Sequence, residues 1–429
     1  MMKNLKSQHK KNQYGVTLIE MMVALIIGLI VSLAIYGVIT SSEGRKRTTT
    51  SVNDIGQSGA YATYQLDKTL RSAGSGYGAL STATYTYGCP LRAAVNGTQI
   101  LPSLTPFPAP FSAVPQTLPL TPVVIISGGA GAGGDVIITM AGSGGLSESG
   151  TKFQNAPTAT QLSLESVSAF RASDTGGTSD IVLLANQPSP NQANCLISQV
   201  SPSFTIKYNQ VPPILADTST LPLAANVNPN YYQDSVNGTA IASFSTSAIV
   251  LNLGQSPTFS MFAVGASSNS GATAADGTNT LFKYDLLNIT DNTAANASAN
   301  PSVFSDGVYV MRAMYGVDND GNPNTTTINW VQPNGVYAAN FLLDGSIASN
   351  TLLQTIVAVK VALILQSSLP EKVPAGQPGI ASPGLAYAGS TASFTLFSDT
   401  ATPITQIVAP TNLRYRVFET TIPIRNRLL

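Results

Sequence analysis

The stretch YGVTLIEMMVAL, Tyr14 to Leu25, decides how the N-terminal part of this chain folds. It opens an apolar run in which Glu20 is the only charged side chain between Val16 and Ile39. A charge at the centre of a bilayer costs about 2.5–3.5 kcal/mol on insertion scales, so Glu20 needs a partner or a function there. The apolar residues 21–39 predict a helix of about 28 Å, which is close to the hydrocarbon thickness of a membrane.

The flanks of this run predict its topology. Four lysines precede it, Lys3, Lys6, Lys10 and Lys11. The positive-inside rule therefore places the N-terminus in the cytoplasm and sends the chain after Thr40 outward. A secretory signal would have a shorter apolar core and an A-x-A-like cleavage site, whereas SSEGRKR follows this run. A plain single-span anchor is the alternative, but it explains neither Glu20 nor the preceding Gly15.

A basic leader, Gly15, the sequence VTLIE and an apolar helix resemble the class III signal of type IV prepilins. This resemblance implies that a membrane peptidase cleaves after Gly15 on the cytoplasmic side and methylates the new N-terminal residue, Val16. The usual residue at that position of the family is Phe, so Val16 is a departure. The resemblance further implies that Thr17 and Glu20 set the register between subunits, with the Glu20 carboxylate paired to the α-amino group of a neighbour.

Composition narrows the class of function. Only 10% of the 429 residues are charged, against about 25% in average proteins. Residues 72–429 carry twelve Lys and Arg against seventeen Asp and Glu. No basic stripe for phosphate contacts is therefore present, which argues against nucleic-acid binding. The single histidine, His9, lies in the segment expected to be removed, so we expect no His-dependent catalysis and no enzyme.

The two cysteines, Cys89 and Cys195, predict one disulfide bond in an exported domain. In the chain-entropy description such a long loop is worth about 4–5 kcal/mol. No CxxC spacing is present, so redox chemistry is not expected.

Beyond the membrane, apolar residues recur at spacings of three and four and predict an amphipathic extension of the first helix, ending at the glycines of AGSGYG. They are Val52, Ile55, Gly59, Ala62, Leu66, Leu70 and Ala73. Short β-branched runs then predict a predominantly β head. We expect an α+β, type IV pilin-like fold with a leader (1–15), a membrane and fibre-core helix (16–42), an amphipathic extension (43–73) and a β-rich head (74–429). Inserted loops are expected over roughly 95–300, including an exposed proline-rich loop at 102–122 and a surface insertion at 265–300.

Distal motifs resemble the PilW family of minor pilins. They are LDKTLRSAGSGYG at 66–78, YVMRAMYGVDNDG at 309–321, VAVKVALILQSS at 357–368 and RYRVFETTIPIRN at 414–426. The resemblance implies a structural subunit of the initiating or tip complex of a type IV pilus. It would contact other minor pilins, the major pilin, the prepilin peptidase and the inner-membrane assembly machinery. It would begin as a single-pass inner-membrane protein with a periplasmic head and end in the pilus at the cell surface. The alternatives are a minor pseudopilin of type II secretion and a pilus-delivered adhesin or ligand-binding head.

Two further motifs contain residue types that are found in cofactor or metal sites. Gly129 to Gly134 match G-x-G-x-x-G after a predicted strand, but the β-branched DVIITM follows instead of a helix, so a β–β connection is expected. DNDGN places Asp318, Asp320 and Asn322 at alternate positions, as hard oxygen ligands for Ca²⁺ would be. Pro323 occupies the turn-glycine position of an EF-hand, so a solvated turn is the main interpretation. No other cofactor is expected.

Overall fold

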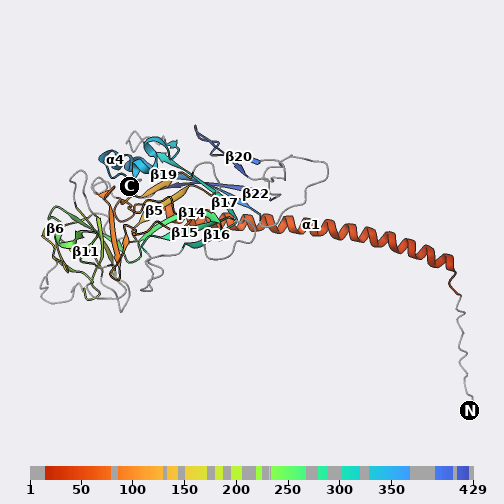
Figure 1. The fold of residues 1–429 in the computed structure, drawn as a ribbon, viewed down its shortest axis with the longest axis horizontal. Coiled ribbons are helices and arrows are strands. Elements are labelled where there is room, and N and C mark those ends of the chain that lie inside the picture. Colours follow the sequence, from red (N-terminus) through yellow and green to blue (C-terminus); the bar gives the residue numbers. More distant parts are fainter. Residues whose placement is uncertain are drawn as a thin grey trace, which may run out of the picture. The chain divides into compact units, whose positions relative to one another are not determined.

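The computed structural model describes residues 15–78, 86–128, 133–143, 150–171, 179–186, 195–204, 219–224, 231, 233–266, 279–287, 301–318, 328–367, 392–408 and 413–424. The chain divides into two compact units, residues 1–53 and 54–429. The helix α1 (Leu18–Arg71) contributes to both, and it is a single α-helix of 54 residues despite its internal glycines (Figure 1). The expected apolar helix and its amphipathic extension are therefore one element.

The second half of α1 packs one face into the head. Ile55, Gly59, Ala62, Leu66 and Leu70 are all buried, which confirms the predicted apolar stripe. The helix ends at Arg71, and Gly74 and Gly76 follow with φ of +79° and +85°, a conformation that glycine adopts without strain. The Gly74 N–H donates to the Met140 carbonyl, so the turn after the helix is tied to a strand of the head.

Three large sheets build the described part of the head. Sheet A contains, in spatial order, β16 (Ser302–Asp306), β15 (Asn279–Asp285), β14 (Thr258–Ala266), β5 (Val136–Ala141) and β3 (Val123–Ile126). Sheet B contains β18 (Asn329–Val331), β17 (Val308–Val317), β19 (Ile356–Gln366) and β22 (Tyr415–Pro423), with β4 (Gly133–Gly134) paired in parallel to β17. Sheet C contains β10 (Thr220–Pro222), β7 (Gln161–Leu164), β6 (Thr151–Asn155), β13 (Ile249–Gly254), β8 (Ile181–Ala185), β9 (Cys195–Gln199), β1 (Leu91–Val95) and β2 (Thr98–Leu101).

Smaller elements complete the head. Two hairpins stand apart from the large sheets, β11 (Ser235–Val236) with β12 (Thr239–Ala240), and β20 (Ala392–Leu396) with β21 (Ile404–Val408). The short helices are η1 (Ile241–Ser243), η3 (Gly335–Tyr337), α3 (Ala339–Leu342) and α4 (Ile347–Thr355). The fold class, a long apolar helix followed by a mostly β head, is as expected.

The central strands β13, β8 and β9 of sheet C are buried on both faces, as their nearly continuous apolar sequences indicate. In β8, Leu183 and Ala185 join the main core, the cluster to which α1 also contributes, while Val182 and Leu184 join a second core on the opposite face. The second core consists of Ala94, Phe153, Leu162, Leu164, Val167, Phe170, Val182, Leu184, Leu196, Val200, Phe204, Leu221, Leu223, Val236, Ile241, Phe244, Ala248 and Val250.

Sheet B is also covered on both sides. Met311, Ala313 and Tyr315 of β17 face the main core. The other face forms an outer core under the β20–β21 hairpin, made by Val310, Met314, Ala362, Ile364, Leu396, Phe397 and Tyr415. The motif segments 309–321, 357–368 and 414–426 thus supply neighbouring strands β17, β19 and β22.

Two sequence-based expectations were wrong in detail, and two short helices were not predicted. The proline-rich segment 102–122 is irregular but not an exposed loop, because Phe107, Phe111 and Leu118 between its prolines are buried in the main core. The range 265–300 is not only a surface insertion, since β15 forms an inner strand of sheet A with Leu281 and Phe282 fully buried. Composition averaged over a window hid the short apolar patterns in both segments. The helices α3 and α4 were missed.

Candidate functional site

The residues at the predicted cleavage junction stand immediately before α1. Gly15, Val16 and Thr17 are not helical and are exposed, Val16 to 74%. The Glu20 N–H donates to Thr17 Oγ1 at 3.3 Å, and the Met21 N–H donates to the Thr17 carbonyl at 3.1 Å. Thr17 is therefore the N-cap, and Thr-x-x-Glu has the spacing of a capping box. Sequence reasoning assigned Thr17 to subunit register and missed this local role, although the spacing was available to reveal it.

The helix that follows presents an apolar surface along residues 16–39. Its large apolar side chains are 50–78% exposed. Two of its hydroxyl groups bond within the helix, Ser32 Oγ to the Gly28 carbonyl at 2.7 Å and Thr40 Oγ1 to the Tyr36 carbonyl at 3.1 Å. The helix is long and apolar enough to cross a membrane. In an apolar environment Glu20 would be the one charged side chain of residues 16–39 that needs an ionic or hydrogen-bonding partner.

Glu20 occupies the third helical position, where the helix dipole favours a negative charge. Among the described residues, none forms an ion pair with its carboxylate. The next charged side chain along α1, Glu43, pairs with Lys46 at 3.6 Å on an exposed surface. The candidate assembly site is thus a short constellation: the Gly15–Val16 junction, the Thr17 cap and the carboxylate of Glu20.

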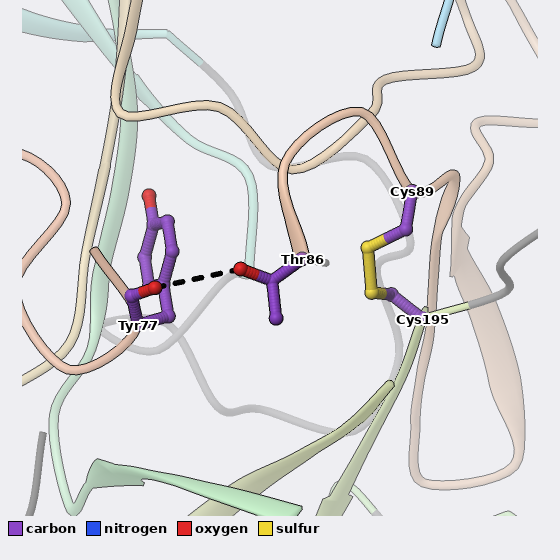
Figure 2. The surroundings of a disulfide bond; sticks show 4 residues. All are labelled: Tyr77, Thr86, Cys89 and Cys195. Atoms are coloured by element: carbon purple, nitrogen blue, oxygen red, sulfur yellow. Dashed lines mark hydrogen bonds between the residues drawn. A yellow bond between two sulfur atoms is a disulfide. The ribbon is translucent and has the colours of Figure 1, made fainter. Parts of the chain in front are cut away.

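The predicted disulfide bond is present. Cys89 and Cys195 are bonded, with Cα atoms 5.6 Å apart and 106 positions between them in sequence, and both are buried (Figure 2). Cys195 begins β9, and its N–H donates to the Pro90 carbonyl, so the bond lies where β9 pairs in parallel with β1. Nearby, Thr86 Oγ1 donates to the Tyr77 carbonyl. The bond joins the segment after α1 to sheet C and is structural.

A buried ion pair that sequence reasoning did not find lies in sheet B. Arg312 of β17 is 4% exposed and donates through Nη1 to Asp135 Oδ1 at 3.0 Å. Its Nε and Nη2 both donate to Gln406 Oε1 of β21, at 2.9 and 2.8 Å. The carboxylate of Asp135 also accepts the N–H groups of Ala313 and Gly128. Burial raises the pKa of Asp135, and the hydrogen bonds and Arg312 oppose that shift only in part.

This ion pair fastens three distant segments together. Asp135 follows the glycine-rich segment, Arg312 lies in the second PilW-like motif, and Gln406 belongs to the β20–β21 hairpin. A second cation on the same face, Lys360, pairs with Asp399 of the hairpin and lies 4.7 Å from the centre of the Trp330 ring. No sequence pattern predicts the partners of Arg312, because Gln406 is 94 positions and Asp135 is 177 positions away from it along the chain.

The structure describes part of each of the two candidate cofactor motifs, the glycine-rich segment and DNDGN. Gly133 and Gly134 form β4 and strand β5 follows, with β3 and β5 antiparallel, so the β–β connection is confirmed; residues 129–132 lie outside the described part. The Asp318 N–H donates to the Thr355 carbonyl, whereas Asp320 and Asn322 lie outside the described residues. Within the part of the chain that the structure describes, no three His, Cys, Asp or Glu side chains group as metal ligands.

An exposed apolar N-terminal helix with one early carboxylate, continuing into a β-rich head, defines a pilin-like protein. Comparison with known families gives the particular class. Residues 262–426 match the family model described as type IV pilus-assembly protein W, and residues 10–36 match the prokaryotic N-terminal methylation motif. The chain therefore carries a match to a PilW domain behind a match to a methylation signal, and these two matches support a type IV pilus-related pilin. Both families are structural rather than enzymatic. Searches of curated proteins and of solved structures find no match.

Proposed function

We propose that this chain is a minor pilin that works in the initiating or tip complex of a type IV pilus after cleavage by the prepilin peptidase. The observation that carries the proposal is the N-terminal constellation: an exposed junction at Gly15–Val16, a capped helix start, and Glu20 as the sole charge on an exposed apolar helix. A β-rich head with the PilW match accompanies it. The precursor would sit in the inner membrane with its N-terminus in the cytoplasm and its head in the periplasm.

The assembly step follows from electrostatics. Removing the leader creates a positive α-amino group at Val16, one residue before the N-cap. In an apolar fibre core this amine and a neighbouring Glu20 carboxylate would each lack a partner, and pairing them offsets part of the desolvation penalty. The rest of residues 16–39 would bury mainly apolar surface, because the hydroxyls of Thr17 and Ser32 already bond within the helix and Tyr36 is the one other polar side chain. Glu20 therefore sets the axial register of one subunit against the next.

The first test is processing. Replacement of Gly15 by Ala should leave an uncleaved precursor, because the added methyl group blocks the peptidase subsite. Intact-mass analysis of membrane protein from cells with and without the peptidase checks this. A peptidase-dependent N-terminus at methylated Val16 is expected for the native chain, and normal processing of the Gly15→Ala chain would contradict the proposal. Gly28→Ala is the matched control, since a Cβ there meets no atom within 4 Å.

The second test separates processing from assembly. Glu20→Gln keeps the side-chain shape but removes the charge, so we expect normal cleavage with pilus number reduced about tenfold or more, as the loss of a charge-assisted bond of 1.5–3 kcal/mol allows. Glu43→Gln, which breaks an exposed pair on the same helix, should change pilus number little. Equal effects of the two substitutions would remove the role of Glu20 in register.

One observation favours a second candidate function, a ligand-binding or adhesive head. Most of sheet C and its second core come from residues 91–254, outside the segment that matches the PilW family. A module with its own core exceeds what a priming subunit requires. Deleting residues 100–300 would also remove β3, β5, β14 and β15 of sheet A, so that deletion does not isolate the module. Antibodies raised against sheet C test it better: blocked attachment with unchanged piliation supports adhesion.

A minor pseudopilin of type II secretion is the remaining alternative. Deletion of the gene distinguishes the two systems, because loss of pili with normal protein secretion supports the pilus, and the reverse supports secretion.

A further inference from the structure

A cationic cluster lies on α1 just beyond its apolar segment, residues 16–39. The sequence SEGRKR occupies residues 42–47, so Arg45, Lys46 and Arg47 are consecutive. All three belong to the same continuous helix as the apolar segment, and all three are exposed. Their distance from the apolar segment along the helix axis is therefore fixed by helix geometry.

The cluster has more cations than carboxylates to pair with them. Its one carboxylate, Glu43, lies 3.6 Å from Lys46 Nζ, and the two side chains are 60% and 72% exposed. No ion pair in the described part of the chain includes Arg45 or Arg47. The next charged residue along α1 is Asp54, about 10 Å further on. Three cations and one carboxylate thus leave a net charge of +2.

Helix geometry places these cations at the headgroups of a membrane that the apolar segment spans. Arg45 and Arg47 follow Ile39 by about 9 and 12 Å along the axis. The headgroup layer on each side of a bilayer is about 5–8 Å thick. Side chains of a helix lean toward its N-terminus, which here is the direction of the apolar segment. The guanidinium groups therefore reach back from their backbone positions into the headgroup layer.

The chemistry of the cluster favours a phosphate group as its ligand. A guanidinium donates two parallel hydrogen bonds to a phosphate and stays charged at physiological pH. Basic residues immediately beside a membrane helix attract anionic lipids. Tyr36, one turn before the end of the apolar segment, is 70% exposed and supplies the amphipathic ring that is typical of a membrane interface.

We propose that Arg45 and Arg47, with Lys46 beside them, bind the phosphates of anionic phospholipids at the outer surface of the membrane and so fix the depth of α1. This inference rests on the proposed pilin function, because that function places α1 in the inner membrane. The occupant is a lipid rather than a protein, since the adjoining apolar segment brings this part of α1 to the bilayer surface.

Fixing the depth of α1 from this side also fixes where Glu20 lies. Glu20 precedes Ile39 by about 28 Å along the helix, whereas the hydrocarbon layer is about 30 Å thick. With Ile39 at the outer edge of that layer, Glu20 lies at its inner edge, and the Gly15–Val16 junction lies beyond it. The free subunit therefore avoids the cost of a carboxylate in mid-bilayer, and the junction stays accessible to the peptidase.

Short-range quenching in vesicles tests the ligand on the full chain with its disulfide bond intact. Ser42, one turn before Arg45, is replaced by Cys and labelled with bimane. The vesicles are phosphatidylcholine with a small, equal mole fraction of spin-labelled phosphatidylglycerol or spin-labelled phosphatidylcholine. We expect phosphatidylglycerol to quench the label about fivefold more strongly, because each cation near the surface contributes about that factor. Equal quenching by the two lipids would overturn the proposal.

Two double variants make the result specific. Arg45→Gln/Arg47→Gln should lower the preference for phosphatidylglycerol to under about twofold. Both arginines are exposed and precede the head unit, so the variant does not disturb its core. Lys68→Gln/Arg71→Gln removes two cations from the last turn of the same helix and should leave the preference unchanged. An unchanged preference in the Arg45→Gln/Arg47→Gln chain would refute the site.

Free phosphate is tested as the other source of the same chemistry. Inorganic phosphate should lower the preference no more than sodium chloride of equal ionic strength does, because both only screen the charges. A loss of the preference in phosphate alone would show a site for the free anion and overturn the lipid assignment.

Depth is measured with bimane at two further positions of α1. A label at Met21→Cys should be quenched more by a spin label near the headgroup than by one at the end of the acyl chain, and a label at Ile30→Cys should show the reverse. Deep quenching at position 21 would contradict the depth assigned to Glu20.

The outcomes also separate the two proposals. If Glu20→Gln lowers piliation but both lipids quench position 42 equally, the pilin function stands and the lipid site fails. If neither lipid quenches position 42, α1 does not enter the bilayer and the pilin function fails first.

Discussion

Replacing Arg312 by Met tests whether the buried ion pair holds sheet B and the β20–β21 hairpin together. The substitution keeps an apolar stem but leaves the carboxylate of Asp135 buried without its cation and Gln406 Oε1 without two donors. Removing one partner of a buried pair costs about 3–5 kcal/mol. The carboxylate keeps two backbone N–H donors, from Ala313 and Gly128, so we expect the lower end, about 3 kcal/mol.

The pH dependence makes this prediction sharper. Burial raises the folded-state pKa of Asp135 above its ordinary value, so its ionised form is disfavoured and the associated stability is lost as pH rises through the folded pKa. Without Arg312 that pKa rises further. The stability difference between native protein and variant should therefore be largest near pH 7.5 and shrink as the pH falls toward 4, because the buried carboxyl then takes up a proton in both proteins.

Urea unfolding of the disulfide-intact protein measures both effects. Trp330, the single tryptophan, packs on the outer core and reports this face by fluorescence. Arg71→Met, the control, removes an exposed arginine from its pair with Asp67 and should lower the free energy of unfolding far less than Arg312→Met does. The double variant Arg312→Met/Asp135→Asn should recover part of the loss and show little pH dependence. A deficit below about 1 kcal/mol at pH 7.5, or one unchanged at pH 4, would refute the argument.

Three further outcomes follow from the structure. Replacing both Cys89 and Cys195 by Ala should lower the free energy of unfolding by up to about 4.8 kcal/mol, as a loop of this length predicts, and urea titration against the oxidised protein checks it; no change would show that the bond is dispensable. Gly59→Leu should separate α1 from β22 and destabilise the head by about 1–3 kcal/mol through overpacking, measured as a lower Tm. Gly44→Leu is the control and should not lower the Tm, because a Cβ at that position has no atom within 4 Å. If Asp318 and its neighbours bind Ca²⁺, EDTA should lower the Tm of the protein and Ca²⁺ should restore it; an unchanged Tm would exclude this site.

Much of the fold could be predicted from local sequence patterns. The apolar helix, its amphipathic continuation and the strands of the PilW-like motifs follow from hydrophobic periods that each segment shows by itself. The disulfide bond could be predicted because the chain has two cysteines in a domain that we expect to be exported. The proline-rich segment and β15 were misjudged, because whether a short apolar segment is buried depends on what covers it. Helix α4 was missed, although Ser346 caps its start with a hydrogen bond to the Ser349 N–H.

The sequence by itself determined the local features of this protein: the lone charge of Glu20, the span of the helix and the β character of the head, while the cleavage junction after Gly15 stays a prediction. Only the tertiary structure decided which strand became an open edge, that Arg312 meets Asp135 and Gln406, and that sheet C has a core on each face. The physical reason is the separation along the chain between the residues that interact. Helix periodicity and capping act within a few residues, whereas strand order and buried ion pairs depend on contacts between segments tens to hundreds of positions apart, such as Arg312 with Gln406 and with Asp135.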